Sequence, residues 1–280
     1  MTSVVLALGA ALGWGVSDFV AAMASRAGSA LVVLWTTQWI GLVCVLAAAI
    51  FFGLGSPEGA DLLYAAGAGV ALTVGLGALY QAMVVGTISI AAPVAATGLS
   101  IPVVVGLASG DDPSTLQVIG LVAAAIGILL CSREPDADGI DRSRVAAGVG
   151  LALLAALGGG LNATGLAAAS SAGVLTVMLV QRATIGTLAL GFLLASRRNA
   201  APEREILSPI LLIGIVDVAA TGSFTAATAI GELSLVSVVS AVYPVVTVLL
   251  AYFVTSERLA SHQVVGAVAA LAGVLAIASG

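Results

Sequence analysis

Long apolar stretches follow one another along almost the whole chain. In an α-helix about 20 apolar residues are enough to cross a hydrocarbon core near 30 Å thick. Ten such stretches are predicted as transmembrane helices: Ser3–Ala24, Ala30–Phe52, Leu62–Val84, Ile88–Ser109, Pro113–Ser132, Val145–Ala169, Val174–Ala195, Ile206–Ile230, Leu233–Thr255 and Leu259–Ser279. Only 8% of residues are charged and 60% are hydrophobic, whereas a globular domain carries about 25% charge. We therefore expect an all-α integral membrane protein with no soluble domain.

Two prolines predict where helices start. Asp112-Pro113 and Ser208-Pro209 each place a capping residue before a proline, which suits the first position of a helix.

The sequence repeats itself after 145 residues. Residues 6–15 align with residues 151–160. Glycines stay in register over most of the length: Gly28 with Gly173, Gly41 with Gly186, Gly69 with Gly214, Gly77 with Gly222 and Gly86 with Gly231. Alanine and leucine match by chance in so apolar a chain, but glycines in register do not. The sequence predicts a first five-helix repeat at residues 1–132, a cytoplasmic linker at residues 133–144 and a second repeat at residues 145–280.

Arginines in the connections predict the orientation of the helices. They follow only odd-numbered stretches: Arg26, Arg133, Arg142, Arg144, Arg197, Arg198, Arg204 and Arg258. Arginine in short connections marks the cytoplasmic side, whereas acidic residues count for little. Both termini are thus expected outside. Matched connections of the two repeats carry opposite bias, as Arg26 against Ser171 illustrates, so the repeats are expected to be inverted relative to one another.

Inverted repeats predict a function. Two such halves around a midplane site can exchange conformations and open the site to each side in turn. The sequence therefore predicts a secondary transporter of the cytoplasmic membrane, an exporter, that moves a small organic solute such as an amino acid or a drug-like molecule by alternating access. The alternatives are a passive channel or facilitative importer, and a membrane-embedded enzyme acting on lipid-linked substrates.

Other functions are disfavoured by what the sequence lacks. It contains no phosphate-binding glycine loop, zinc-ligand spacing or Ser/His/Asp set, and it has a single histidine. No enzyme activity, metal or cofactor is expected, and transport is expected to be coupled to a proton or another gradient, or to be uncoupled. Nine arginines against fourteen acidic residues argue against a nucleic-acid partner. The oligomeric state stays open.

Several segments resemble the EamA-type repeat of the drug/metabolite transporter superfamily. They are Gly13–Phe19, Gly231–Val239, Tyr243–Val245, Ser256–Leu259 and Gln263–Gly266. The first repeat departs from the pattern, because residues 109–113 stand where an acidic-basic pair is expected. The resemblance implies ten helices, with helices 1–4 and 6–9 around a central cavity and helices 5 and 10 at the periphery. It also implies export or import of amino acids or other metabolites, without fixing the substrate.

Three ionisable residues lie inside the predicted spans: Asp18, Arg182 and Asp217. A charge at the bilayer centre costs about 2.5–3.5 kcal/mol on insertion scales, so such residues face a cavity or a partner. Arg182 and Asp217 fall near mid-bilayer on neighbouring helices, so an ion pair is expected. The pair either neutralises itself, or it binds a charged group of the solute or takes the coupling proton. Asp18 either serves the solute or a proton, or it caps a neighbouring helix or meets Arg26.

A threonine stripe favours the functional interpretation of the pair. Asp217, Thr221, Thr225 and Thr228 share one face of their helix. Such a stripe usually faces water or another helix, although threonine hydroxyls also bond to their own helix. The matching positions Leu72, Leu76 and Tyr80 are mostly apolar, which predicts one polar and one apolar cavity wall.

Further residues complete the predicted site. Further substrate or coupling candidates are Trp14, Ser17, Tyr80, Thr221 and Thr225, and the second-tier candidates are Trp35, Gln38, Trp39, Gln81, Asn162, Gln181 and Tyr243. Prolines inside helices break the backbone ladder, so Pro93, Pro102 and Pro244 are expected to form kinks at which gates bend. Glu257 and Arg258 are expected to have a structural or gating role. Gly120, Gly127, Gly266 and Gly273 leave small faces for close helix packing.

Overall fold

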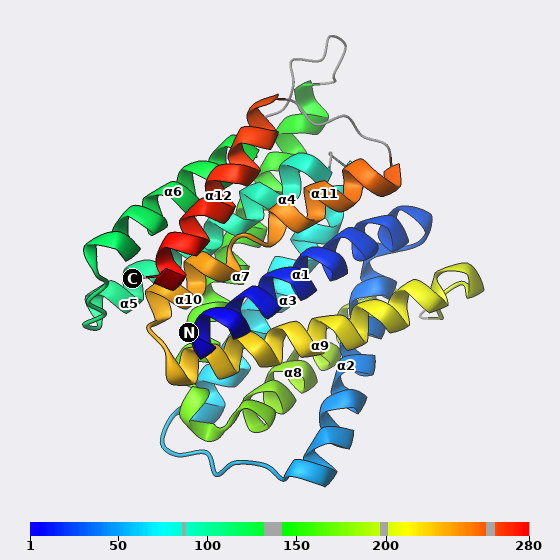
Figure 1. Cartoon of the computed structure of the whole chain (residues 1–280). Helices are drawn as coiled ribbons and strands as arrows, with labels where there is room; N and C mark the ends of the chain where they lie inside the picture. The colour runs from blue at the N-terminus through cyan, green and yellow to red at the C-terminus, as the bar shows by residue number, and fades with distance from the viewer. Residues whose placement is uncertain (86–87, 132–141, 197–200, 256–260, 280) are drawn as a thin grey trace.

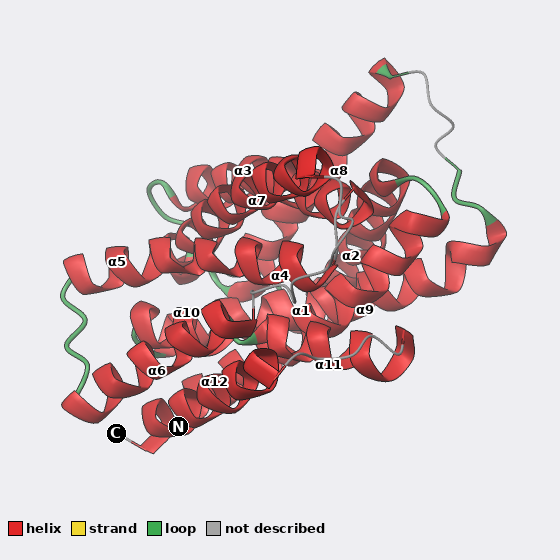
Figure 2. Ribbon diagram, turned by 90° about the horizontal axis from the view of Figure 1, so that it is seen from above, coloured by secondary structure: helices red, strands yellow, loops and turns green. Residues whose placement is uncertain are grey.

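A computed structural model describes residues 1–85, 88–131, 142–196, 201–255 and 261–279, and in these residues the fold is entirely helical (Figures 1 and 2). The α-helices are α1 (Thr2–Ala27), α2 (Ala30–Phe52), α3 (Asp61–Val85), α4 (Ile88–Ala96), α5 (Ser100–Ala108), α6 (Thr115–Cys131), α7 (Arg142–Ala168), α8 (Val174–Ala195), α9 (Leu207–Ile230), α10 (Leu233–Ser240), α11 (Tyr243–Thr255) and α12 (Ser261–Ser279). Three single 3₁₀ turns join some of them: η1 (Thr97–Leu99), η2 (Ser170–Ala172) and η3 (Arg204–Ile206).

The length of these segments suits a membrane. Among the described residues, seven helical segments are long and apolar enough to span one, and two shorter apolar helices cover Val94–Ala108 and Thr115–Gly127. The segment Leu233–Val254 counts among the seven although it combines α10 and α11. The ten spans inferred from the sequence stay a prediction.

Two of the predicted spans, in which kinks were expected at prolines, are divided into shorter helices. The Ile88–Ser109 stretch forms α4, η1 and α5, and the Leu233–Thr255 stretch forms α10 and α11 with a turn at residues 241–242. Pro102 and Pro244 each lie shortly after a break. Neither can donate a hydrogen bond to the carbonyl four residues earlier. Pro93, in contrast, lies within α4 and does not end it.

The capping residues predicted for two helices differ from those observed. α6 begins at Thr115, and a capping box fixes this start: Ser114 N donates to Gln117 Oε1 at 2.8 Å, and Gln117 N donates to Ser114 Oγ at 3.2 Å. α9 begins at Leu207, directly after η3. Pro209 therefore lies within the first turn, where its missing N–H leaves no hydrogen bond unmade.

Helices of the first half pack mostly against helices of the second half. α1 packs on α9 and α11, while α7 packs on α3 and α4. α2 packs on α8, and α6 packs on α12 at one side of the bundle (Figure 2). Gly273 of α12 touches α6, since a Cβ on it would lie 2.6 Å from the carbonyl oxygen of Gly120. The close packing predicted for these two glycines is confirmed.

Glycines also allow α1 to approach α9, and α7 to approach α3. A Cβ on Gly13 would lie 2.7 Å from the Cβ of Ala220, and a Cβ on Gly158 would lie 2.6 Å from the Cα of Gly75. Both distances are shorter than real Cβ contacts. Gly13 and Gly158 are 145 residues apart, and so are Gly75 and Ala220.

A second pair of contacts has the same spacing. A Cβ on Gly15 would lie 2.6 Å from the carbonyl oxygen of Tyr243, and a Cβ on Gly160 would overlap the carbonyl oxygen of Gly98. Tyr243 begins α11, and Gly98 lies in η1. These glycines therefore bring α1 and α7 directly against the two broken helices.

The two ends of the bundle carry different contacts. The N-terminus and the end of α12 lie toward the same end (Figure 1). Near the start of α10, Asp111 Oδ2 accepts a hydrogen bond from Ser234 N at 2.8 Å, and at the start of α3, Asp61 accepts one from Ser171 Oγ at 3.2 Å. At the other end Arg26 Nε donates to Met83 O at 3.1 Å.

Candidate functional site

A cavity lies between the two halves of the chain. Its empty volume is about 680 Å³, including the space at its opening. Its walls come from α1, α3, α4, η1, α7, α9 and α11. The lining residues are Trp14, Asp18, Leu72, Gly75, Leu76, Leu79, Ala95, Leu99, Ala155, Gly159, Asn162, Ala163, Asp217, Thr221 and Tyr243.

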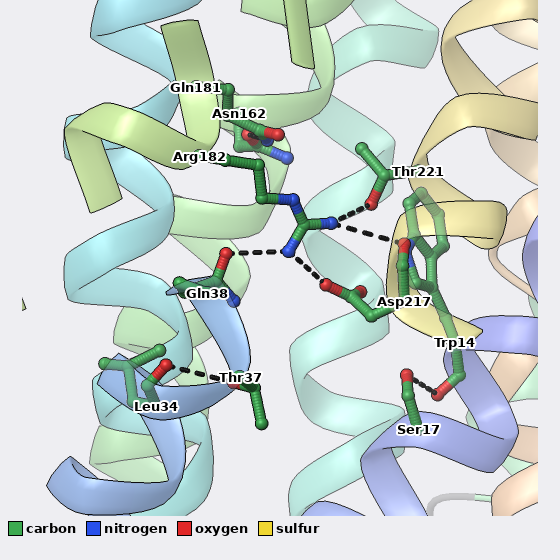
Figure 3. Close-up of polar contacts among 10 residues, drawn as sticks. All are labelled: Trp14, Ser17, Leu34, Thr37, Gln38, Asn162, Gln181, Arg182, Asp217 and Thr221. Carbon is green, nitrogen blue, oxygen red and sulfur yellow. Dashed lines mark hydrogen bonds and ion pairs between the residues drawn. The ribbon is translucent and has the colours of Figure 1, made fainter. Parts of the chain in front are cut away.

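Arg182 of α8 is the centre of a polar network beside this cavity (Figure 3). Its Nη1 donates to Asp217 Oδ2 at 2.6 Å and to Gln38 Oε1 at 2.7 Å. Its Nη2 donates to Thr221 Oγ1 at 3.0 Å and to the backbone oxygen of Asp217 at 3.3 Å. The ion pair expected between Arg182 and Asp217 is confirmed.

The two members of the pair are placed differently. The side chain of Arg182 is fully buried and does not line the cavity, whereas that of Asp217 is 17% exposed and does line it. Arg182 therefore lies behind Asp217 and Thr221, and it holds both side chains at the cavity wall. Gln38 of α2 completes the network, although its sequence context indicated only a secondary candidate.

The threonine stripe of α9 does not continue along the cavity. Thr221 lines it, but Thr225 Oγ1 donates to Thr221 O at 2.9 Å and Thr228 Oγ1 donates to Thr225 O at 3.0 Å, both within the helix. On the opposite wall Leu72 and Leu76 line the cavity, while Tyr80 is buried in the helix packing outside it.

An amide pair connects α7 to α8. Gln181 Nε2 donates to Asn162 Oδ1 at 2.6 Å (Figure 3 shows both side chains). Asn162 lines the cavity, and Gln181 is fully buried behind it. This arrangement repeats the one around Arg182, because a buried side chain of α8 again holds a polar group at the cavity wall.

Asp18 and Trp14 of α1 border the cavity together. Asp18 makes no hydrogen bond or ion pair with any described residue, so it neither caps a helix nor pairs with Arg26. The indole ring of Trp14 lies 5.3 Å from the ring of Phe224 and 6.3 Å from that of Tyr243, measured between centroids. Tyr243 also lines the cavity.

Several predicted residues lie elsewhere. Ser17 is buried and its Oγ donates to Trp14 O within α1 at 3.1 Å. Gln81 is exposed on α3 and is not a lining residue. Pro102 and Pro244 lie in the broken helices. Glu257 and Arg258 lie outside the described residues.

Comparisons with known proteins agree with this architecture. Residues 146–279 match the EamA-like transporter family. Among solved structures 28 chains match, and one crystal structure of a protein superimposes with a TM-score of 0.75 over 98% of this chain and 95% of that chain. Its sequence is 17% identical, so the match concerns the fold alone. No curated protein matches.

Proposed function

We propose that this protein is a multi-pass membrane transporter that exports a small organic solute by alternating access. Residues 146–279 match the EamA-like transporter family, which is part of the drug/metabolite transporter superfamily. In this proposal the chain has ten membrane spans in two inverted five-helix repeats, with boundaries near residues 132 and 145. Transport is driven by a gradient, and a proton is the proposed coupling ion.

The observation that carries the proposal is a cavity at the junction of two reciprocally packed halves. α1 packs on α9 and α11 as α7 packs on α3 and α4, and the glycine contacts that close these junctions share the 145-residue spacing. Halves that interact in this reciprocal way can exchange conformations, which would open the cavity at one end while closing it at the other.

The broken helices are the proposed gates. The two breaks occupy nearly equivalent positions in the 145-residue repeat. η1 begins at Thr97, and the other break begins 144 residues later, at Ala241. Each break borders the cavity, through Leu99 in one case and Tyr243 in the other. Bending at these points would change the width of the cavity entrance without unfolding either helix.

A cysteine in the cavity tests alternating access. We expect Leu76→Cys, with Cys44 and Cys131 replaced by alanine, to react with a membrane-impermeant thiol reagent from either side of oriented membrane vesicles. Leu166→Cys is the matched control and should react from neither side, because Leu166 is fully buried. Reaction of Leu76→Cys from one side only would contradict the proposal.

A cross-link separates a carrier from a channel. Asp111 contacts the N-terminal end of α10 through Ser234, so oxidising an Asp111→Cys/Ser234→Cys pair should hold that end of the protein closed. In a carrier the cysteine at residue 76 should then react faster from the opposite side. In a channel its reactivity from that side should not change.

A further inference from the structure

Asp18 is an acidic side chain without a counter-charge in the part of the chain that the structure describes. It is 8% exposed, and it lines the cavity. It makes no hydrogen bond or ion pair with a described residue. A buried carboxylate without partners is costly unless something else compensates its charge. Such a carboxyl group either takes up a proton or meets a counter-charge, and because the open side of Asp18 is the cavity, the counter-charge would come from a bound molecule.

Aromatic rings stand beside this carboxylate. Trp14 precedes Asp18 by four residues, so both side chains lie on one face of α1. Tyr243 approaches Trp14 edge to face with ring centroids 6.3 Å apart, and both rings line the cavity. The faces of tryptophan and tyrosine attract organic cations, most strongly where water is excluded.

The cavity offers no comparable site for a negatively charged group of a solute. The described lining contains no lysine, arginine or histidine. The nearby Arg182 is fully buried, and its Nη1 and Nη2 atoms are bonded to Asp217, Gln38 and Thr221. The remaining donor, Nε, has no partner among the described residues, but it is buried and Arg182 does not line the cavity, so the carboxylate of an anion or of an amino acid would have to pass or displace Asp217 and Thr221. A cation meets Asp18 without displacing any protein group.

The remaining lining residues favour a solute with an apolar body. Leu72, Leu76 and Leu79 are spaced four and three residues apart on α3 and form one wall, and Leu99 adds to it. We infer that the cavity binds a monovalent organic cation with an apolar or aromatic body, and that Asp18 is its counter-ion. The inference rests on the proposed function in one respect, since it names the solute class for the same cavity.

Binding to the purified full-length protein in detergent tests the inference. The probes are benzyltrimethylammonium, the neutral benzyl alcohol and the zwitterion phenylalanine, measured by isothermal titration calorimetry. We expect benzyltrimethylammonium to bind at least about tenfold more tightly than either of the others, which corresponds to about 1.4 kcal/mol. Asp18→Asn should weaken benzyltrimethylammonium binding about tenfold or more. Asp112→Asn is the matched control and should leave binding unchanged, because Asp112 is exposed and outside the cavity.

Two results would overturn the inference: unchanged benzyltrimethylammonium binding by a folded Asp18→Asn variant, or binding of phenylalanine or benzyl alcohol at least as tight as that of the cation. The comparison of probes uses the unaltered protein, so it decides the question even if Asp18→Asn does not fold. Detergent binding needs no gradient and no alternation. If the cysteine at residue 76 reacts from both sides but no cation binds, only the solute class is wrong.

Discussion

The charge of Asp217 at the cavity wall is compensated by a single residue, Arg182. Removing one member of a buried ion pair leaves the other charge uncompensated, which typically costs about 3–5 kcal/mol. Arg182→Gln alone should therefore strongly lower the thermal unfolding temperature of the purified protein, and so should Asp217→Asn alone. The double variant should recover most of the lost stability, because no unpaired charge remains.

Transport by the same double variant separates the two roles that the sequence left open for the pair. If Arg182 only positions Asp217 and Thr221, as its full burial suggests, the double variant should keep transport within several-fold of the unaltered protein. A double variant that is stable but inactive would instead support binding of an anionic solute group by Arg182, which the sequence favoured. That result would also weaken the inference of a cationic solute.

The sequence identified charged residues well but could not tell which of them face the cavity. Asp18, Arg182 and Asp217 stand out because ionisable residues are rare in apolar helices. Their exposure depends on how α1, α2, α8 and α9 pack, and that packing is not encoded in the spacing along one helix. Gln38 had no stronger signal than other polar residues, since its role arises only when α2 meets α8.

At the scale of helices, glycine contacts set how closely α7 packs. Gly158→Ala would place a Cβ 2.6 Å from both the Cα of Gly75 and the carbonyl oxygen of Ala71. Such overpacking typically costs about 1–3 kcal/mol. We therefore expect Gly158→Ala to lower the free energy of unfolding in a reversible detergent assay. Gly150→Ala is the matched control in the same helix, where a Cβ would touch nothing. It should be neutral or stabilise by up to about 1 kcal/mol, because alanine favours helix more than glycine does. Equal effects of the two changes would contradict a close α3–α7 contact.

Helix positions were largely predictable, because hydropathy shows which segments are apolar enough to lie in a membrane. The breaks were not, since α4 and α5 together read as one apolar run. Pro102 and Pro244 indicated a kink, but the sequence did not show that each helix would actually end. The start of α6 was readable, because Ser114 and Gln117 have the spacing of a capping box. The prediction used the neighbouring Asp112-Pro113 as the start signal instead, and therefore placed the start of the helix at Pro113 and not at Thr115.

At the scale of the whole molecule, the two ends of the bundle differ in charge, and this difference predicts the orientation in the membrane. The N-terminus and the end of α12 lie toward one end (Figure 1), and the connections after even-numbered predicted helices, which contain Asp61 and Asp111, are expected at that end too. Arg26 and Arg204 lie in connections after odd-numbered predicted helices, which would be at the opposite end. Positive charge in short connections is retained in the cytoplasm. A reporter enzyme that works only outside the cytoplasm should therefore be active when fused after Gly280, and a cytoplasm-only fluorescent protein should stay dark there. The same two reporters inserted at residues 132–141 should behave in the opposite way. Fluorescence from the C-terminal fusion would show that the arginines do not set the orientation of this protein, and the termini would then be cytoplasmic.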